Sequence, residues 1–322
     1  MIDDAQTTRP PDRADPAVSV VTPTYNRGPL LRRIHESLKH QTVSFEWIVV
    51  DDGSTDDTQR IVEEMRDPSA VYLKMPRNSG VNAARNAGLK RARGAYIQLL
   101  DSDDEFVPGG LDRAVESLRA APPNVGAVLL DAKPAGEIRG LPTLTDGEIL
   151  REYDLVCRLA LQGDKATIYR REVFDLCSLP EDLSSSEHVF VFEVSKHFDY
   201  LWRARSCVQL HRQNDNLSEP DNLIRRSHDI AVSYERIVRN HSALLARYPS
   251  AAARLLTKAM YRYLVASDWR NGWRVYWLLL RLHPTPRTIG YATGALFMGL
   301  LAPLGFERMR LQRRAPRIPV LT

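Results

Sequence analysis

Short apolar runs alternate with amphipathic stretches along the first 130 residues of the chain. Five runs rich in β-branched and large apolar residues have the length of buried strands: Val18–Thr22, Trp47–Val50, Val71–Lys74, Tyr96–Leu100 and Gly126–Leu130. Four stretches between them have helical spacing: Leu30–Lys39, Thr58–Met65, Val81–Ala92 and Gly110–Arg119. Strands and helices that alternate in this way form βαβ units, so we predict a mostly parallel sheet with helices on both faces.

The pattern changes twice farther along the chain. After about residue 140 strands and helices are mixed, and from Asp221 onward apolar residues recur at helical spacing. We therefore expect a tail over residues 1–16, an α/β domain over 17–220 with a boundary near 131, a helical subdomain over 221–285 and a C-terminal segment over 286–322. The tail is rich in Asp, Arg and Pro and has no hydrophobic stretch. We interpret it as a solvated tail and not a signal peptide, which predicts a cytoplasmic location for the folded part.

Composition and charge exclude several classes of protein. Of the 322 residues, 43% are hydrophobic and 26% are charged, which excludes wholesale disorder. The net charge is +4, and five arginines between Arg308 and Arg317 account for it, so the rest of the chain is close to neutral and we expect no nucleic-acid partner. Three cysteines without a CxxC pair argue against a disulfide framework or a zinc site and indicate a reducing compartment.

Polar segments follow four of the predicted strands: Pro23–Asn26, Asp51–Ser54, Arg77–Gly80 and Asp101–Asp104. Ligands of open α/β sheets bind at the carboxyl ends of the strands, so we expect these segments to form one site. Asp101 and Asp103 flank Ser102, and two carboxylates at such a place suit Mg2+ or Mn2+ held jointly with substrate phosphates. An Asp-rich turn is the alternative interpretation.

Other polar residues at these strand ends also have two interpretations. Asp51 and Asp52 can accept hydrogen bonds from a base or a ribose, while Asp56 can N-cap the following helix. Arg85, in the helix that begins near Asn82, can reach a base or a phosphate, or it can lie on a solvated helix face.

The order of these segments is more specific than any one of them. The series Pro23-Thr-Tyr-Asn26, Asp51-Asp-Gly-Ser-Thr-Asp56, Asn78-Ser-Gly80 with Asn82 and Ala84-Arg-Asn-Ala-Gly88, and Leu100-Asp-Ser-Asp-Asp104 resembles the family 2 glycosyltransferases, which have a GT-A fold. The resemblance covers residues 17–131 closely and 160–218 more loosely. It implies a Rossmann-like domain whose first half binds a nucleotide sugar, usually UDP-linked, and whose second half binds an acceptor. It also implies inverting transfer assisted by a divalent cation.

The resemblance further implies roles for single residues. Those that would bind the nucleoside are Pro23, Tyr25, Asp52 and Arg85, with Asp51, Asn82 and Ser102 in the same donor site. Asp101 would contact the ribose or the metal, and Asp103 would be the principal metal ligand. His211 can complete the metal shell, with a purely structural histidine as the alternative.

The second half resembles the acceptor region of the family. Lys165–Phe174 resembles its strand and short helix, and Arg212 with Leu217-Ser218 resembles its closing motif. Between them the family usually carries Glu-Asp, whose acid deprotonates the acceptor hydroxyl, whereas this chain has Glu187-His188.

We expect Glu187 to be the catalytic base, with His188 as the second candidate and Glu181 or Asp182 as substitutes. Alternatively, Glu187 only caps a helix. The expected function is transfer to a saccharide or glycolipid acceptor in cell-surface polysaccharide or glycoconjugate synthesis. Two alternatives remain. One is a catalytically inactive, membrane-associated module that binds nucleotide sugars, and the other is a nucleotidyltransferase.

The C-terminal region combines an uncharged segment with aromatic and basic residues. Thr288–Phe306 carries no charge, but its 19 residues include Gly290, Gly294, Gly299 and Pro303, which weaken a spanning helix. Nucleotide sugars are cytosolic and the arginines of 308–317 also favour the cytosolic side, so we expect association with the inner face of the cell membrane without a span. Upstream, Trp269, Trp273 and Trp277 alternate with arginines, as at a headgroup boundary, unless this stripe packs inside a soluble helical domain.

Overall fold

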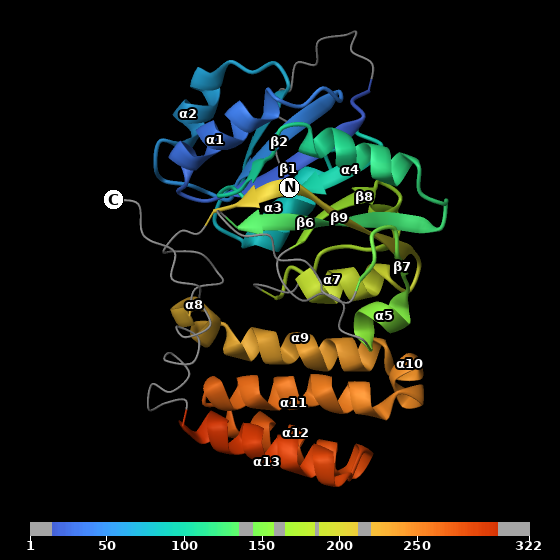
Figure 1. The fold of residues 1–322 in the computed structure, drawn as a ribbon. Helices are drawn as coiled ribbons and strands as arrows, with labels where there is room; N and C mark the ends of the chain where they lie inside the picture. Colours follow the sequence, from blue (N-terminus) through green and yellow to red (C-terminus); the bar gives the residue numbers. More distant parts are fainter. Residues whose placement is uncertain (1–14, 135–143, 158–164, 184–186, 212–219, 302–322) are drawn as a thin grey trace.

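The computed structural model describes residues 15–134, 144–157, 165–183, 187–211 and 220–301. A central sheet with helices on both faces occupies one end of the molecule, and layers of further helices are stacked against that part (Figure 1). The first part of the chain thus forms the predicted α/β arrangement, and the last part is helical.

The elements of the described residues have the following bounds. The strands are β1 Val18–Thr24, β2 Phe45–Asp51, β3 Ala70–Lys74, β4 Tyr96–Leu99, β5 Glu105–Phe106, β6 Val125–Pro134, β7 Ile149–Leu150, β8 Lys165–Arg170 and β9 Asp199–Leu210. The helices are α1 Gly28–Leu38, α2 Thr58–Met65, α3 Val81–Leu89, α4 Gly110–Arg119, α5 Glu152–Val156, α6 Val173–Leu176, α7 Glu187–Val194, α8 Pro220–Arg225, α9 Ser227–Asn240, α10 Ser242–Arg247, α11 Pro249–Val265, α12 Trp269–Leu282 and α13 Pro286–Leu301.

The strands form one sheet in the order β3-β2-β1-β4-β8-β6-β9-β5, with β7 paired to β9. β1 to β4 are parallel, as predicted from the alternation of strands and helices. β8 is antiparallel to both of its neighbours, β4 and β6, so the sheet is mixed in its second half. Farther along the chain, β9 is again parallel to β6, with the helices α5, α6 and α7 between them in sequence.

Several predicted element ends differ from the structure. The strand predicted over Gly126–Leu130, for example, runs from Val125 to Pro134. The first strand does not stop before Pro23 but continues to Thr24, with Pro23 opposite Val50 of β2. Pro23 is tolerated because β4 pairs with β1 only as far as Val21, so the missing N–H removes no bond from the ladder on that side. Helix α3 ends at Leu89 and not at Ala92, because the chain turns there to enter β4.

The sheet buries alternating side chains on its two faces. Val18 and Val20 of β1 pack with α1 and α4 in one apolar cluster, and Val21 packs toward α3 in another. At Gly88, α3 lies so close to the sheet that a Cβ atom would be 2.5 Å from Val21 Cγ1. Gly88 therefore sets the depth of α3, the helix that also carries Asn82 and Arg85.

The helical layers are joined to the sheet domain by apolar packing. Phe190 and Val194 of α7 belong to the same buried cluster as Ile237 of α9 and Leu255 of α11. On its other side α11 packs against α12 and α13 through Leu264, Val275 and Ala292 among others. The layers thus follow one another as α7, α9, α11 and then α12 with α13 (Figure 1).

Candidate active site

Two hydrogen bonds join the loops that follow β1 and β2. The backbone N–H of Asn26 donates to Ser54 Oγ at 2.8 Å, and Thr55 N–H donates to Asn26 Oδ1 at 2.9 Å. Asn26 has φ 52°, a left-handed conformation that asparagine adopts more readily than most residues. The turn leaves Tyr25 42% exposed beside the strand ends, whereas Pro23 is buried in β1. Tyr25 is thus accessible to a planar base, and its role in binding the nucleoside stays a prediction.

Asp51 and Asp52 are buried and bonded to neighbouring loops. Asp51 accepts hydrogen bonds from Ser54 N–H at 2.7 Å and from the hydroxyl of Tyr72. The two oxygens of Asp52 accept from Ser79 N–H at 2.7 Å and from Gly80 N–H at 2.8 Å, while burial raises the pKa of Asp52. Both acids therefore fix the loops that lead to the site, and their contact with a donor stays a prediction.

Asn82 holds the loop that precedes α7. Its Nδ2 donates to the carbonyl oxygens of Pro180 at 2.8 Å and Leu183 at 3.1 Å. Asn86, one turn along α3, donates to Leu179 O at 2.9 Å and to Glu181 Oε1 at 2.9 Å. The predicted role of Asn82 in donor binding is untested, and in this structure its amide joins α3 to the loop that precedes α7.

Arg85 is buried and bridges two acids. Its Nη2 lies 2.6 Å from Asp101 Oδ1 and 2.8 Å from Glu187 Oε1. Although burial of the guanidinium opposes its charge, the two carboxylates outweigh that effect and raise the pKa of Arg85. The sequence predicted a nucleoside contact for Arg85 but gave no sign of this bridge, which brings Asp101 and Glu187 to one cation.

Three acids gather after β4. One ligand oxygen from each of Asp101, Asp103 and Asp104 can be chosen so that all lie within 4.8 Å of one another. The side chain of Asp101 is 46% exposed and that of Asp103 is 10% exposed. Such a set of carboxylate oxygens, open on one side, fits Mg2+ or Mn2+ bound together with substrate oxygens. Ser102 is buried between the first two acids.

Asp104 was not assigned a role from the sequence. Burial, followed by the charges of Asp101 and Asp103, raises the pKa of Asp104 to about 9. The metal-free site therefore holds a proton on Asp104 at neutral pH, and a cation that bound all three carboxylates would displace it.

His211 lies beside the acids but is bonded elsewhere. Its Nε2 lies 2.7 Å from Glu105 Oε1, and its backbone N–H donates to Asp104 Oδ1 at 3.2 Å. The strand pairing of β5 with β9 brings these residues together. Among the described residues, the side chains close enough together to hold one metal ion are Asp101, Asp103 and Asp104, without His211. The predicted role of His211 as a metal ligand is untested.

The four candidate bases differ in position. Glu187 is the first residue of α7, is 63% exposed and faces Arg85. His188 is exposed, and its ring lies 6.4 Å from that of Phe192, one turn along α7. Asp182 forms an ion pair with Arg236 of α9. Of the four, Glu187 is the one joined through Arg85 to the acids after β4.

Three further cations near the site were missed from the sequence. Arg27 Nη1 lies 3.6 Å from Asp103 Oδ2, and Arg33 donates to the carbonyl oxygen of Asp103. Arg226, between α8 and α9, is close enough to Glu187 for their charges to interact. Arg27 directly follows the Pro23–Asn26 segment, so its place near the site could have been predicted from the sequence. Arg226 lies near Glu187 only because of the packing of the helical layers. The predicted closing motif, Arg212 with Leu217 and Ser218, lies outside the described residues.

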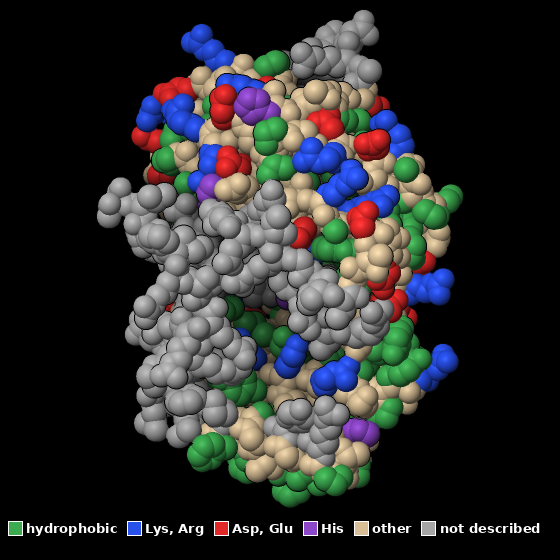
Figure 2. Space-filling model, viewed as in Figure 1, with side chains coloured by type: hydrophobic (Ala, Val, Ile, Leu, Met, Phe, Trp, Pro, Cys, Tyr) green, Lys and Arg blue, Asp and Glu red, His purple; other side chains and the backbone are tan. Residues whose placement is uncertain are grey.

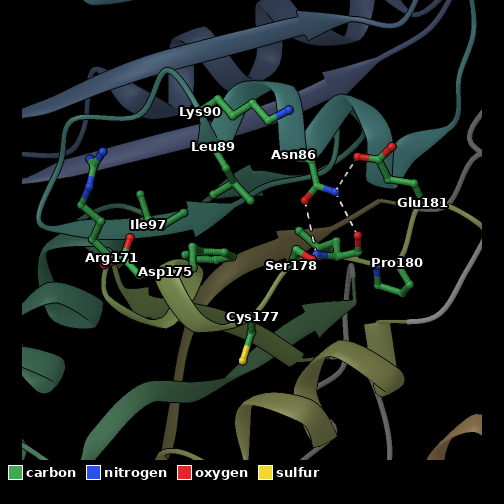
Figure 3. A pocket seen from close by; sticks show the side chains of 12 residues that line it. Asn86, Leu89, Lys90, Ile97, Arg171, Asp175, Cys177, Ser178, Pro180 and Glu181 are labelled. Atoms are coloured by element: carbon green, nitrogen blue, oxygen red, sulfur yellow. Dashed lines mark hydrogen bonds between the residues drawn. The ribbon is translucent and has the colours of Figure 1, made fainter.

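A hollow of about 650 Å3 lies on another side of α3 (Figure 3). Asn86, Lys90, Arg171 and Glu181 are among the residues that line it, and the Asn86 amide bonds the loop at its edge. None of the residues predicted to bind the donor or the metal lines this hollow. It is therefore separate from the acids after β4.

Comparison with known proteins identifies the sequence pattern. The sequence model of glycosyl transferase family 2 matches residues 19–176. The succinoglycan biosynthesis protein ExoO of Rhizobium meliloti is 36% identical over 137 residues, which cover 42% of this chain and 39% of that protein. A Campylobacter jejuni enzyme named GalNAc(5)-diNAcBac-PP-undecaprenol beta-1,3-glucosyltransferase is 26% identical over 62% of this chain and 66% of its own length. The chain thus aligns with less than two thirds of the length of each of these two relatives.

Solved structures give the same fold. Staphylococcus aureus TarS 1–349 in complex with UDP-GlcNAc has a TM-score of 0.56 and 20% identity, with 94% of each chain covered. The mannosyltransferase PcManGT of Pyrobaculum calidifontis, in complex with GDP-Man and Mn2+, has a TM-score of 0.57 and 19% identity, with 93% of this chain and 84% of that chain covered. The predicted GT-A fold is confirmed.

Proposed function

We propose that this chain, which belongs to the family 2 glycosyltransferases, transfers a sugar from a nucleotide diphosphate sugar to an acceptor hydroxyl with inversion at the anomeric carbon. One observation supports the assignment most directly. Arg85 joins Asp101, in the acid cluster after β4, to Glu187, the exposed carboxylate at the start of α7. A candidate cation-binding cluster and a candidate base are thereby held at one guanidinium group.

The donor half would bind the nucleotide sugar, and we favour a UDP-sugar. Tyr25 offers an exposed ring for the base, and Asp101, Asp103 and Asp104 would hold Mg2+ or Mn2+. When bound, the cation would neutralise charge on the diphosphate leaving group. Arg27, Arg33 and Arg85 surround the acids, so donor phosphates would meet several positive groups there.

The acceptor half would supply the base. We propose that Glu187 accepts the proton of the acceptor hydroxyl as its oxygen forms a bond to the anomeric carbon and the bond from that carbon to the diphosphate oxygen breaks. Attack from the side opposite the diphosphate inverts the configuration. Because Glu187 is exposed and borders the donor half, an acceptor can approach it from solvent. His188 faces Phe192 and serves this role less well.

The acceptor is proposed to be a saccharide, either free in a growing polymer or carried on a lipid. The names of the two relatives connect one with succinoglycan biosynthesis and the other with an undecaprenol-linked glycan. We place the reaction on the cytosolic side of the cell membrane, where nucleotide sugars are made. No helix among the described residues is long and apolar enough to cross a membrane.

A donor panel tests the reaction class. The full-length protein is incubated with UDP-, GDP- and dTDP-sugars and Mg2+ or Mn2+, and the products are separated. Release of nucleoside diphosphate that is accelerated by saccharide acceptors and abolished by EDTA is the expected result. Pyrophosphate release would instead indicate a nucleotidyltransferase, and donor binding without turnover would indicate an inactive binding module. Asp103→Ala is expected to lose turnover with every donor, whereas the exposed Arg119→Gln, on α4, is the matched control.

A further inference from the structure

Helix α12 directs its tryptophans away from the protein. Trp269, Trp273 and Trp277 are 36%, 44% and 57% exposed and recur every fourth residue. The opposite side of the helix, with Gly272, Val275 and Leu279, is buried against α11. The sequence left open whether this stripe packs inside a helical domain, and the structure shows that it does not. Three large aromatic side chains gathered on one open face mark a candidate interaction surface.

Helix α13 continues the same layer. Both helices pack on α11, and α13 buries Thr288 and Ala292 on that side. Its outer side exposes Ile289 at 43% and Phe297 at 61%, while Leu282 at the end of α12 is 54% exposed. The two helices form the outermost layer of the molecule, at the end opposite the sheet (Figure 1). Apolar side chains gather along that end (Figure 2).

The charges of this layer have one sign. No acidic residue occurs between Asp268 and Glu307, whereas four arginines do: 270, 274, 281 and 287. Arg270 and Arg281 are exposed, and neither pairs with an acid among the described residues. Arg274 binds Glu235 on α9. The face formed by α12 and α13 is therefore aromatic and cationic, with no carboxylate of its own.

We propose that the face formed by α12 and α13 binds the surface of an anionic lipid bilayer, with both helices parallel to the membrane plane. The tryptophans and Phe297 would insert at the boundary between headgroups and acyl chains, where amphipathic aromatic rings are favoured. Arg270 and Arg281 would contact lipid phosphates. Headgroup phosphates supply the negative charge that the protein itself lacks on this face.

The same charge pattern disfavours a second copy of the chain as the partner. In a two-fold symmetric dimer a patch meets an identical patch. Here that arrangement would place Arg270 and Arg281 of each subunit against a face on which residues 269–306 carry positive charges and no acid, and like charges at an interface cost affinity. An anionic bilayer has no such conflict.

Flotation with vesicles tests the proposal and requires neither donor nor transfer, so its failure is distinct from failure of the proposed function. The protein is mixed with phosphatidylcholine vesicles that contain either no anionic lipid or about 30% phosphatidylglycerol, which gives the vesicle surface a negative charge. We expect co-flotation with the anionic vesicles at low salt, weaker binding at high salt, and a blue shift of tryptophan emission.

Two double variants locate the contact. Trp273→Ser with Trp277→Ser should lower the partition coefficient at least ~10-fold, because the apolar insertion is lost. Arg270→Gln with Arg281→Gln should weaken binding and flatten its salt dependence. The control for the first is Leu176→Ser on α6, where an apolar side chain is 62% exposed away from this face, and the control for the second is Arg119→Gln. Circular dichroism confirms that each variant is folded.

Three outcomes would overturn the proposal. The first is full-length protein that stays unbound from anionic vesicles at low salt. The second is binding that survives both double variants but is lost when residues 307–322 are removed, which would assign it to the basic tail. The third is a concentration-dependent dimer that the tryptophan substitutions dissociate, with no vesicle binding.

Discussion

Arg85 connects two acids that belong to different halves of the chain, Asp101 after β4 and Glu187 at the start of α7. Its side chain is 5% exposed, whereas the two acids are 46% and 63% exposed and can be solvated without it. Replacing a buried ion by an apolar side chain of similar length is often neutral for stability in such a case. The burial of Arg85 is thus better explained by the two carboxylates that it positions than by a contribution to the free energy of unfolding.

We expect Arg85→Met to lower sugar transfer by roughly 10²–10³-fold, as for loss of one preorganised charge, with little change in melting temperature. Steady-state kinetics and thermal denaturation measure the two effects. Arg85→Lys is the matched variant, because it retains one positive charge but lacks the planar fork that contacts two carboxylates, and it should be intermediate. A melting temperature that falls in parallel with activity would contradict the assignment.

Glu187 and His188 are neighbours in sequence, but only Glu187 faces Arg85. Glu187→Gln cannot accept a proton, so we expect kcat to fall by roughly 10²–10⁴-fold while donor affinity persists. His188→Ala should change kcat far less, because its ring lies beside Phe192. Acceptor-dependent turnover and donor titration are the measurements. A large loss in His188→Ala with little loss in Glu187→Gln would move the base to the histidine.

The free energy of unfolding should depend on pH through Asp104. Burial and the neighbouring acids raise the pKa of Asp104 to about 9, above the ordinary aspartate value of 3.8. Between these values the folded state binds a proton that the unfolded state has released, so stability falls as pH rises. The slope is at most about 1.4 kcal/mol per pH unit for one proton. In EDTA, urea denaturation from pH 5 to 8 should show this fall, and Asp104→Asn should be less affected by pH. Parallel curves for the two proteins would contradict the prediction.

Among the elements, those predicted correctly are the ones with a local signal. α2 and α4 have the predicted bounds because their apolar residues repeat at helical spacing between clear turns. The antiparallel direction of β8 had no local signal, since it depends on which strands it meets in space. The same distinction holds in the site. That Asp101 and Asp103 lie together could be predicted from a short motif, whereas Arg226 comes near Glu187 only through the packing of distant helices.

The position of α3 depends on a glycine in its last turn. A Cβ at Gly88 would lie 2.5 Å from Val21 Cγ1 and 2.9 Å from Val50 Cγ2, in two different strands. Gly88→Ala should therefore destabilise the protein by about 1–3 kcal/mol through overpacking. Gly290→Ala in α13 is the matched control, because no other described part of the chain lies within 4 Å of the added Cβ and alanine favours the helix. Urea denaturation compares them, and equal stability of the two variants would contradict the role of Gly88.

In the whole molecule, the candidate site and the proposed membrane face are separated by stacked helices. α7, which carries Glu187, packs on α9, α9 packs on α11, and α11 packs on α12 and α13 (Figure 1). Packed helices lie about 8–10 Å apart, so these three steps place Glu187 on the order of 25 Å from the outer layer. If that layer rests on the bilayer, an acceptor hydroxyl directly beside the headgroups does not reach Glu187.

We therefore expect the enzyme to prefer acceptors whose terminal sugar extends well beyond the lipid. Lipid-linked acceptors with one, three and five sugars are incorporated into anionic vesicles, and transfer is measured at equal surface density. Transfer should rise with the number of sugars, since a chain must span roughly the three helix spacings between bilayer and site. The same saccharides without lipid, added in detergent-free solution, are the control, and they should show much weaker dependence on length because nothing fixes their distance from Glu187. Equal transfer to the one-sugar and five-sugar lipids would contradict this orientation of the enzyme on the membrane, while the flotation result would still stand.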